Sequence, residues 1–237
     1  NYDVRVGRVQ ARPADPAAFL RKYEEWYEQM KVTGDLGAFT VRDLPVDLEY
    51  VEWLPDDLRW ERLSEMAARQ EGYCTLSQAR WVGYADEVFL ALIPAGKVHA
   101  CAVDVFRLAQ FPRSDHEEHL VLWLQTDRQG VLSHETALLL HELSDILPRR
   151  LHIMVPPGFD PGARRFDPSV ELLRGDVADD EKCWLGPVPY TSALRTLRDC
   201  IAIGVSPDLI EQAIEEGLER GLFTEDQIPV TVPAKSA

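Results

Sequence analysis

Tyr73-Cys-Thr-Leu-Ser-Gln-Ala-Arg-Trp-Val-Gly83 predicts a short helix with a defined beginning and end. The hydroxyl of Thr75 can accept a hydrogen bond from the first turn of the helix, which is how a threonine at the N-cap position stabilises it. Leu76, Ala79 and Trp81 supply the apolar positions, and Gly83 follows them. We therefore expect a helix bounded by turns on both sides.

The segments on either side add two helices and a hairpin. A preceding helix begins near Asp57 and is ended by Gly72, and a third helix runs from about Ala85 to Ile93. Lys97-Val-His-Ala-Cys-Ala-Val-Asp-Val-Phe-Arg-Leu108 then splits into two short strands with alternating apolar residues. The order helix, helix, turn, helix and two-stranded hairpin over residues 57–110 is typical of a winged helix-turn-helix.

Residues 1–56 form an N-terminal segment that we expect to be α+β. The pattern predicts a strand over 2–6, a helix after Asp15-Pro16 and further strands over 39–41 and 48–54. The helix carries an aromatic stripe, which is more typical of core packing than of a groove for a partner. The role of this segment stays open.

Residues 111–237 predict a small α/β domain in which helices alternate with strands. Strands are expected over 151–155, 170–173 and 188–191. Helices are expected over 115–124, from an N-cap at Ser133 to a point before Pro148, over 192–203, and over 208–220 with Ser206-Pro207 before it and Gly221 after it. The fold class that we expect for the whole chain is α+β.

The charge of the chain is strongly acidic and unevenly distributed. The net charge of the 237 residues is −15. Residues 1–56 carry a net charge of −4, residues 57–110 carry −1, and residues 111–237 carry −10, from 12 basic and 22 acidic side chains. A protein that binds mainly nucleic acid usually has a basic surplus. The acidic segments would repel phosphate and would suit a basic protein partner.

Four motifs follow one another in the second half of the chain. They are Gly130-Val-Leu-Ser-His-Glu-Thr-Ala-Leu-Leu-Leu-His-Glu-Leu-Ser-Asp-Ile-Leu-Pro148, His152-Ile-Met-Val-Pro156, Val188-Pro-Tyr-Thr-Ser-Ala-Leu-Arg-Thr-Leu-Arg-Asp199 and Ala213-Ile-Glu-Glu-Gly-Leu-Glu-Arg-Gly-Leu222. In this order, and with Phe106-Arg-Leu108 closing the hairpin before them, they resemble the AbiEi family of antitoxins and transcriptional regulators. The resemblance covers about residues 58–228.

The resemblance implies an antitoxin of a type IV toxin–antitoxin system. In such a protein the winged helix binds operator DNA, the C-terminal domain provides the antitoxin activity, and the partner is a nucleotidyltransferase-like toxin. This chain departs from the pattern in having residues 1–56, and in a third helix that begins with Asp86-Glu87 and has no basic residue. Bases are read by Arg, Lys, Asn or Gln side chains, and phosphates need Lys or Arg.

Three functions therefore stay open. The first is an antitoxin-like protein that acts by binding a protein partner; whether it also regulates its own operator stays open. The second is a winged-helix transcriptional regulator without a toxin partner. The third is a protein-binding module with a degenerate winged helix.

Charged side chains are the candidates for these contacts. Arg80, Lys97 and Arg107 are the candidate DNA-binding residues, because they lie on the helix before the turn and beside the hairpin. Two groups are candidates for partner binding: the pair Arg164 and Arg165 in a loop rich in proline and glycine, and an acidic ridge of Glu211, Glu215 and Glu219. The three glutamates recur every four residues and so share one face of the last helix.

Catalytic, metal and cofactor sites are not indicated. His116 and His119 lack the i, i+4 spacing of zinc-binding histidines, and His134 and His141 lie seven residues apart without a third ligand nearby. Ser133-His-Glu lacks the context of a nucleophile, and no phosphate-binding loop or cysteine pair with ligand spacing is present in the sequence. We expect no enzyme, no cofactor, no metal and no membrane segment, and a cytoplasmic location; an unrecognised hydrolase is the remaining alternative.

Overall fold

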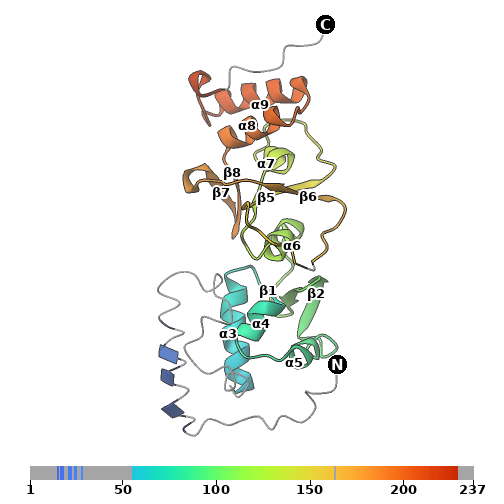
Figure 1. The fold of residues 1–237 in the computed structure, drawn as a ribbon, viewed down its shortest axis with the longest axis vertical. Helices are drawn as coiled ribbons and strands as arrows, with labels where there is room; N and C mark the ends of the chain where they lie inside the picture. Colours follow the sequence, from blue (N-terminus) through green and yellow to red (C-terminus); the bar gives the residue numbers. More distant parts are fainter. Residues whose placement is uncertain are drawn as a thin grey trace. The chain divides into compact units, whose positions relative to one another are not determined.

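The computed structural model describes residues 55–162 and 164–228, together with residues 15, 17, 18, 21, 22, 24, 25 and 28. The chain divides into two compact units, residues 1–115 and 116–237. Both units contain helices and a sheet, so the described fold is mixed α+β (Figure 1). The strands predicted over 2–6, 39–41 and 48–54 lie outside the described residues; of the helix predicted after Pro16, the described residues 17, 18, 21, 22, 24, 25 and 28 are helical.

From residue 55 onward, unit 1 contains three helices and a three-stranded antiparallel sheet. The elements are α3 (Asp56–Ala68), β1 (Tyr73–Thr75), α4 (Leu76–Trp81), α5 (Asp86–Leu90), β2 (Val98–Ala102) and β3 (Val105–Leu108). The sheet order is β1-β3-β2, so the hairpin of β2 and β3 is extended by β1. The sequence predicts the three helices and the two hairpin strands, whereas β1, directly before the second helix, was not predicted.

The beginning of α4 is built as its sequence predicts. Thr75 accepts a hydrogen bond from the Gln78 amide at 3.1 Å, and the Gln78 side chain accepts one from the Thr75 amide at 2.9 Å. This reciprocal capping box satisfies two amide groups at the start of the helix. Gly83 after the helix has φ 96, a conformation that favours glycine. The turn between α4 and α5 is therefore fixed by local sequence.

Helix α5 is shorter than predicted. The pattern predicted a helix from about Ala85 to Ile93, but α5 ends at Leu90 and the next residues form turns. The amides of Leu92 and Ile93 bond to carbonyls three residues back, at 3.0 and 3.1 Å. Pro94 explains the difference, because a proline disfavours helical backbone at the residue before it. Phe89 anchors the short helix in the core of unit 1 with no exposed surface.

The described residues of unit 2 form a five-stranded mixed sheet between helices. Its elements are α6 (Glu117–Gln125), β4 (Val131–Leu132), α7 (His134–Leu140), β5 (Leu151–Val155), β6 (Val170–Arg174), the 3-10 turn η2 (Asp179–Glu181), β7 (Lys182–Leu185), β8 (Val188–Thr191), α8 (Ala193–Ala202), α9 (Pro207–Glu219) and the 3-10 turn η3 (Glu225–Gln227). The sheet order is β6-β5-β4-β8-β7. The β5–β6 and β4–β8 pairs are parallel, and the β4–β5 and β7–β8 pairs are antiparallel.

The helices of unit 2 cover both faces of its sheet. Helix α6 lies on one face, and α7, α8 and α9 are stacked on the other (Figure 1). Leu138 of α7, Leu197 of α8 and Ile210 of α9 have no exposed surface and belong to one apolar cluster. Burying a leucine or isoleucine side chain stabilises a fold by about 1.5–3 kcal/mol. The apolar residues of α8 and α9 therefore pack into the core of unit 2, as the helical spacing of those residues predicts.

The caps of two helices in unit 2 differ from the prediction. Ser133 and Ser206 occupy the N-cap positions of α7 and α9, but neither side chain makes a capping hydrogen bond. The Ser206 carbonyl instead accepts the Leu209 and Ile210 amides. Gly221 after α9 has φ 64, as expected of a glycine that ends a helix. No helix in the described part of the chain is long and apolar enough to cross a membrane.

Candidate functional site

The start of α5 in unit 1 holds an ion pair. Arg80 at the end of α4 donates to both carboxylate oxygens of Asp86, from Nε at 2.6 Å and from Nη2 at 2.7 Å. The hydrogen bond to Asp86 raises the pKa of Arg80. A guanidinium held in this bidentate geometry is already matched to a carboxylate. Arg80 was predicted as a DNA contact, but its charge is directed at the neighbouring helix.

The other two predicted DNA contacts lie beside the hairpin. The Lys97 Nζ lies 5.8 Å from the centre of the Trp60 ring, a distance at which cation–π attraction acts. Arg107 is half-buried and donates from Nη1 to the Phe111 carbonyl. Lys97 is exposed, so it remains able to reach a ligand. The Arg107 side chain is held by its hydrogen bond to Phe111, which lies just after strand β3.

The exposed surface of α5 combines acidic and apolar side chains. Glu87 is exposed, and Val88 and Leu90 are 46% and 41% exposed. This surface has the chemistry of a contact with protein, because apolar and negatively charged groups do not pair with phosphates.

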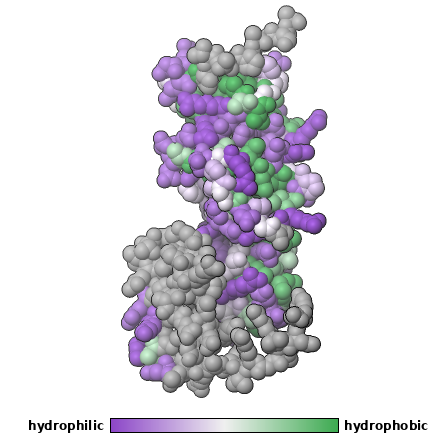
Figure 2. Space-filling model, viewed as in Figure 1, coloured by the Kyte–Doolittle hydropathy of each residue, from purple (hydrophilic) through white to green (hydrophobic). Residues whose placement is uncertain are grey.

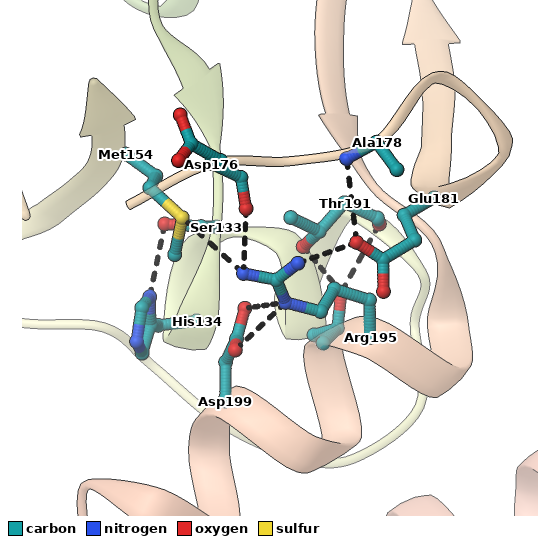
Figure 3. Close-up of polar contacts among 10 residues, drawn as sticks. Ser133, His134, Met154, Asp176, Ala178, Glu181, Thr191, Arg195 and Asp199 are labelled. Carbon is teal, nitrogen blue, oxygen red and sulfur yellow. Dashed lines mark hydrogen bonds and ion pairs between the residues drawn. The ribbon is translucent and has the colours of Figure 1, made fainter. Parts of the chain in front are cut away.

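A cluster of polar side chains surrounds Arg195 in unit 2 (Figure 3). Arg195 Nε donates to the two carboxylate oxygens of Asp199 at 2.9 and 3.1 Å, and Nη1 donates to Glu181. Nη2 donates to the Asp176 carbonyl at 3.2 Å and lies 3.5 Å from the Met154 sulfur. Burial lowers the pKa of Arg195, but the hydrogen bonds and charges of Asp199 and Glu181 outweigh it and raise that pKa. Arg195 thereby joins α8 to η2 and to the chain before it.

Ser133 and His134 lie next to this cluster (Figure 3). Ser133 Oγ is 2.9 Å from His134 Nδ1, and the His134 ring centre is 6.0 Å from that of His152. His134 has φ 51, which is unusual for a residue with a side chain. Burial lowers the pKa of His134, so its neutral form is favoured. A serine beside a neutral histidine resembles a nucleophile and its base, but Ser133 has no exposed surface and a substrate cannot reach it without movement of the chain.

The residues predicted to bind a partner differ in their surroundings. Arg164 donates to both carboxylate oxygens of Asp127 at 2.6 and 2.9 Å, which ties its loop to the end of α6. Arg165 is exposed beside it. The acidic ridge lies on α9, where Glu215 and Glu219 are exposed and Glu211 is partly exposed. Figure 2 shows hydrophilic side chains over much of the visible face of unit 2, with apolar areas between them.

The histidines with candidate spacing have structural contacts. His141 Nε2 lies 2.8 Å from the Thr191 carbonyl, which links the end of α7 to β8. His119 is buried whereas His116 is exposed, so the two point into different surroundings. Among the described residues, no group of three or more His, Cys, Asp or Glu side chains could hold a metal ion.

One feature of the sequence indicates the Arg195 cluster, although the prediction did not use it. Arg195 and Asp199 have the i, i+4 spacing of a helical ion pair. The contact between Arg195 and Glu181 joins residues 14 apart and depends on the fold of η2 and β7. No known protein-family model and no curated protein matches the chain.

Proposed function

We propose that this chain is an antitoxin-like regulatory protein of a type IV toxin–antitoxin system, and that it acts in the cytoplasm by binding a basic, nucleotidyltransferase-like toxin. In this proposal residues 57–110 form a winged helix and residues 111–237 form the antitoxin domain. The ordered motifs of residues 130–222 support the proposal, as does the helix–strand order of unit 1, with α5 followed by the β2–β3 hairpin.

The ion pair between Arg80 and Asp86 is the observation on which the preference for a protein partner rests. It places a neutralised arginine and two acidic residues at the start of α5, where a DNA-binding winged helix would present donors to base edges. The exposed Val88 and Leu90 add apolar surface at the same helix. Such a surface favours association with protein over binding to a phosphate backbone.

Co-expression with the product of the neighbouring gene tests the proposal. We expect that product to stop bacterial growth when expressed alone, and growth to return when this chain is expressed with it. A chain with Leu138→Asp, in which a charge is buried in unit 2, is the loss-of-function control, and it should fail to restore growth. If the unchanged chain does not restore growth and the two proteins do not co-purify, the proposal is wrong.

Operator autoregulation is the second candidate function, and the helix–strand order of unit 1 is what favours it. A gel-shift assay with the DNA upstream of the chain's own gene distinguishes the two candidates. We expect weak binding that is lost at physiological salt, and further weakening by Lys97→Ala, which removes about one phosphate contact. Nanomolar, sequence-specific binding at physiological salt would establish the second function instead.

A further inference from the structure

The outer edge of strand β7 is open in the described part of the chain. Strand β7 is the last strand in the sheet order β6-β5-β4-β8-β7 and pairs only with β8 there. Next to β7, the Ser192 amide donates to the Glu181 carbonyl at 2.7 Å. Antiparallel pairs alternate between hydrogen-bonded and non-hydrogen-bonded positions. The backbone groups of Lys182 and Trp184, which follow Glu181 by one and three residues, therefore point away from β8. The Lys182 N–H is occupied, because it donates to the Asp179 carbonyl. The Lys182 C=O and the N–H and C=O of Trp184 are left for the open edge.

Trp184 stands beside these backbone groups. Its side chain is 63% exposed, although it is among the largest apolar side chains of the chain. It lies opposite Pro189 in the hairpin register. Edge-strand recognition combines main-chain hydrogen bonds with contacts to alternate side chains, and exposed tryptophans frequently dominate the binding energy of an interface. Strand β7 supplies both components.

The charge around the start of β7 is negative. Lys182 Nζ lies 2.7 Å from Asp179 Oδ1, and the guanidinium of Arg195 is held by two carboxylates. Five carboxylates lie near Lys182 and Arg195, so the cluster has a net charge of −3. They are Asp176, Asp179, Asp180, Glu181 and Asp199. Asp176, Asp179 and Asp180 are exposed. A strand that carries lysine or arginine is complementary to this surface.

We propose that the outer edge of β7 binds an extended, basic strand of a protein partner, with Trp184 covering the apolar side chains of that strand. The inference rests on the proposed function, in which the chain acts through a basic protein partner. A second copy of this chain is disfavoured as the occupant, because two copies paired along β7 would bring two negatively charged clusters together.

A synthetic peptide of four alternating Val-Lys pairs, labelled with fluorescein, tests the edge in the full chain. Fluorescence anisotropy at low salt measures its affinity, and the indole N–H signal of Trp184, assigned in an NMR spectrum by its loss in Trp184→Phe, locates the binding. We expect the signal to shift on titration. We expect about thirty-fold weaker binding to Trp184→Ala and about tenfold weaker binding to the double variant Asp176→Asn with Asp180→Asn.

Two control peptides and one control variant make the result specific. Val-Glu pairs should not bind, because their charge is wrong, and a Val-Lys peptide interrupted by proline should not bind, because proline cannot donate to the edge. Leu147→Ala, at an apolar side chain that is 86% exposed elsewhere in unit 2, should bind like the unchanged chain. The indole signals of the other tryptophans report whether Trp184→Ala remains folded.

Three results would overturn the inference. One is failure of the Val-Lys peptide to shift the Trp184 signal. Another is equal affinity for Trp184→Ala and the unchanged chain. The third is a dimer of this chain, measured by light scattering, that Trp184→Ala converts to monomer. If the toxin-like partner co-purifies equally well with Trp184→Ala, the edge proposal is wrong while the proposed function stands. If the peptide binds at β7 but the neighbouring gene product does not bind the chain and its toxicity is not relieved by it, the proposed function is wrong and the edge remains.

Discussion

Replacement of Arg195 by methionine should destabilise unit 2 more than any other single change of an ion pair described above. The side chains of Arg195 and Asp199 are 18% and 15% exposed, and that of Glu181 is 29% exposed. Methionine fills much of the same volume, but it leaves Asp199 and Glu181 without their cation. Breaking a fully buried ion pair costs about 3–5 kcal/mol. Because water reaches this cluster in part, we expect a loss of about 3 kcal/mol in the free energy of unfolding.

Urea denaturation of the full chain, followed by circular dichroism and by tryptophan fluorescence, measures this loss. Arg198→Met is the matched control on the same helix, because Arg198 is exposed and its contact with the Gln227 carbonyl is long, at 3.4 Å. A double-mutant cycle with Asp199→Asn isolates the Arg195–Asp199 interaction, because the asparagine removes the charge that methionine leaves unpaired. If Arg195→Met costs no more than Arg198→Met, the cluster does not stabilise unit 2 and the reasoning is refuted.

Three further predictions concern α9 and the buried histidines. The double variant Glu215→Lys with Glu219→Lys should slow association with a basic toxin-like partner in stopped-flow measurements, and the effect should shrink as the salt concentration rises. An unchanged association rate at low salt would show that the acidic ridge is not part of the interface. Gly217→Ala should lower the free energy of unfolding by about 1–3 kcal/mol, because the added methyl group would lie 2.2 Å from Phe223 Cζ. Gly158→Ala is the control and should cost less than half as much, because no atom lies within 4 Å of its added methyl group. Burial lowers the pKa values of His119, His134 and His141. The folded state therefore binds fewer protons than the unfolded state below about pH 6.5, and the free energy of unfolding should fall as the pH drops below that value. His141→Gln should flatten this dependence in urea denaturation, and an unchanged dependence in that variant would contradict the prediction.

Short strands are the elements that sequence reasoning could not find. Strands β1 and β4 have only three and two residues, too few for an alternating pattern to be distinguished from a loop. Strand β7 has four residues, Lys182-Cys-Trp-Leu185, but they do not alternate between polar and apolar side chains. Their pairing is decided by partners distant in sequence: Leu132 of β4 lies beside Tyr190 of β8, and Tyr73 of β1 lies beside Arg107 of β3. The longer helices α8 and α9 were predicted because their apolar spacing persists over several turns.

The arginines show a second limit of sequence reasoning. Arg80 and Arg164 were predicted as contacts for DNA and for a partner because each is a basic residue in a suitable segment. In the structure each guanidinium is matched by a carboxylate, Asp86 across a turn and Asp127 from a position 37 residues away. A charge count along the chain cannot show this pairing. Glu215 and Glu219 could be predicted more directly, because one helix places them on a common face regardless of the remaining fold.

The charges that stay exposed after such pairing decide whether the chain attracts a basic protein or DNA. In unit 1, folding directs Arg80 and Arg107 toward groups of the chain itself and leaves Lys97 exposed, while Glu87 on α5 stays exposed. In unit 2, exposed carboxylates remain at both the start of β7 and the ridge of α9. Folding therefore matches Arg80 with a carboxylate and directs Arg107 toward a backbone carbonyl, and it keeps negative charge where a basic protein would be attracted. The salt dependence of binding therefore distinguishes the two partners. At low salt we expect strong attraction of a basic protein and only weak attraction of DNA.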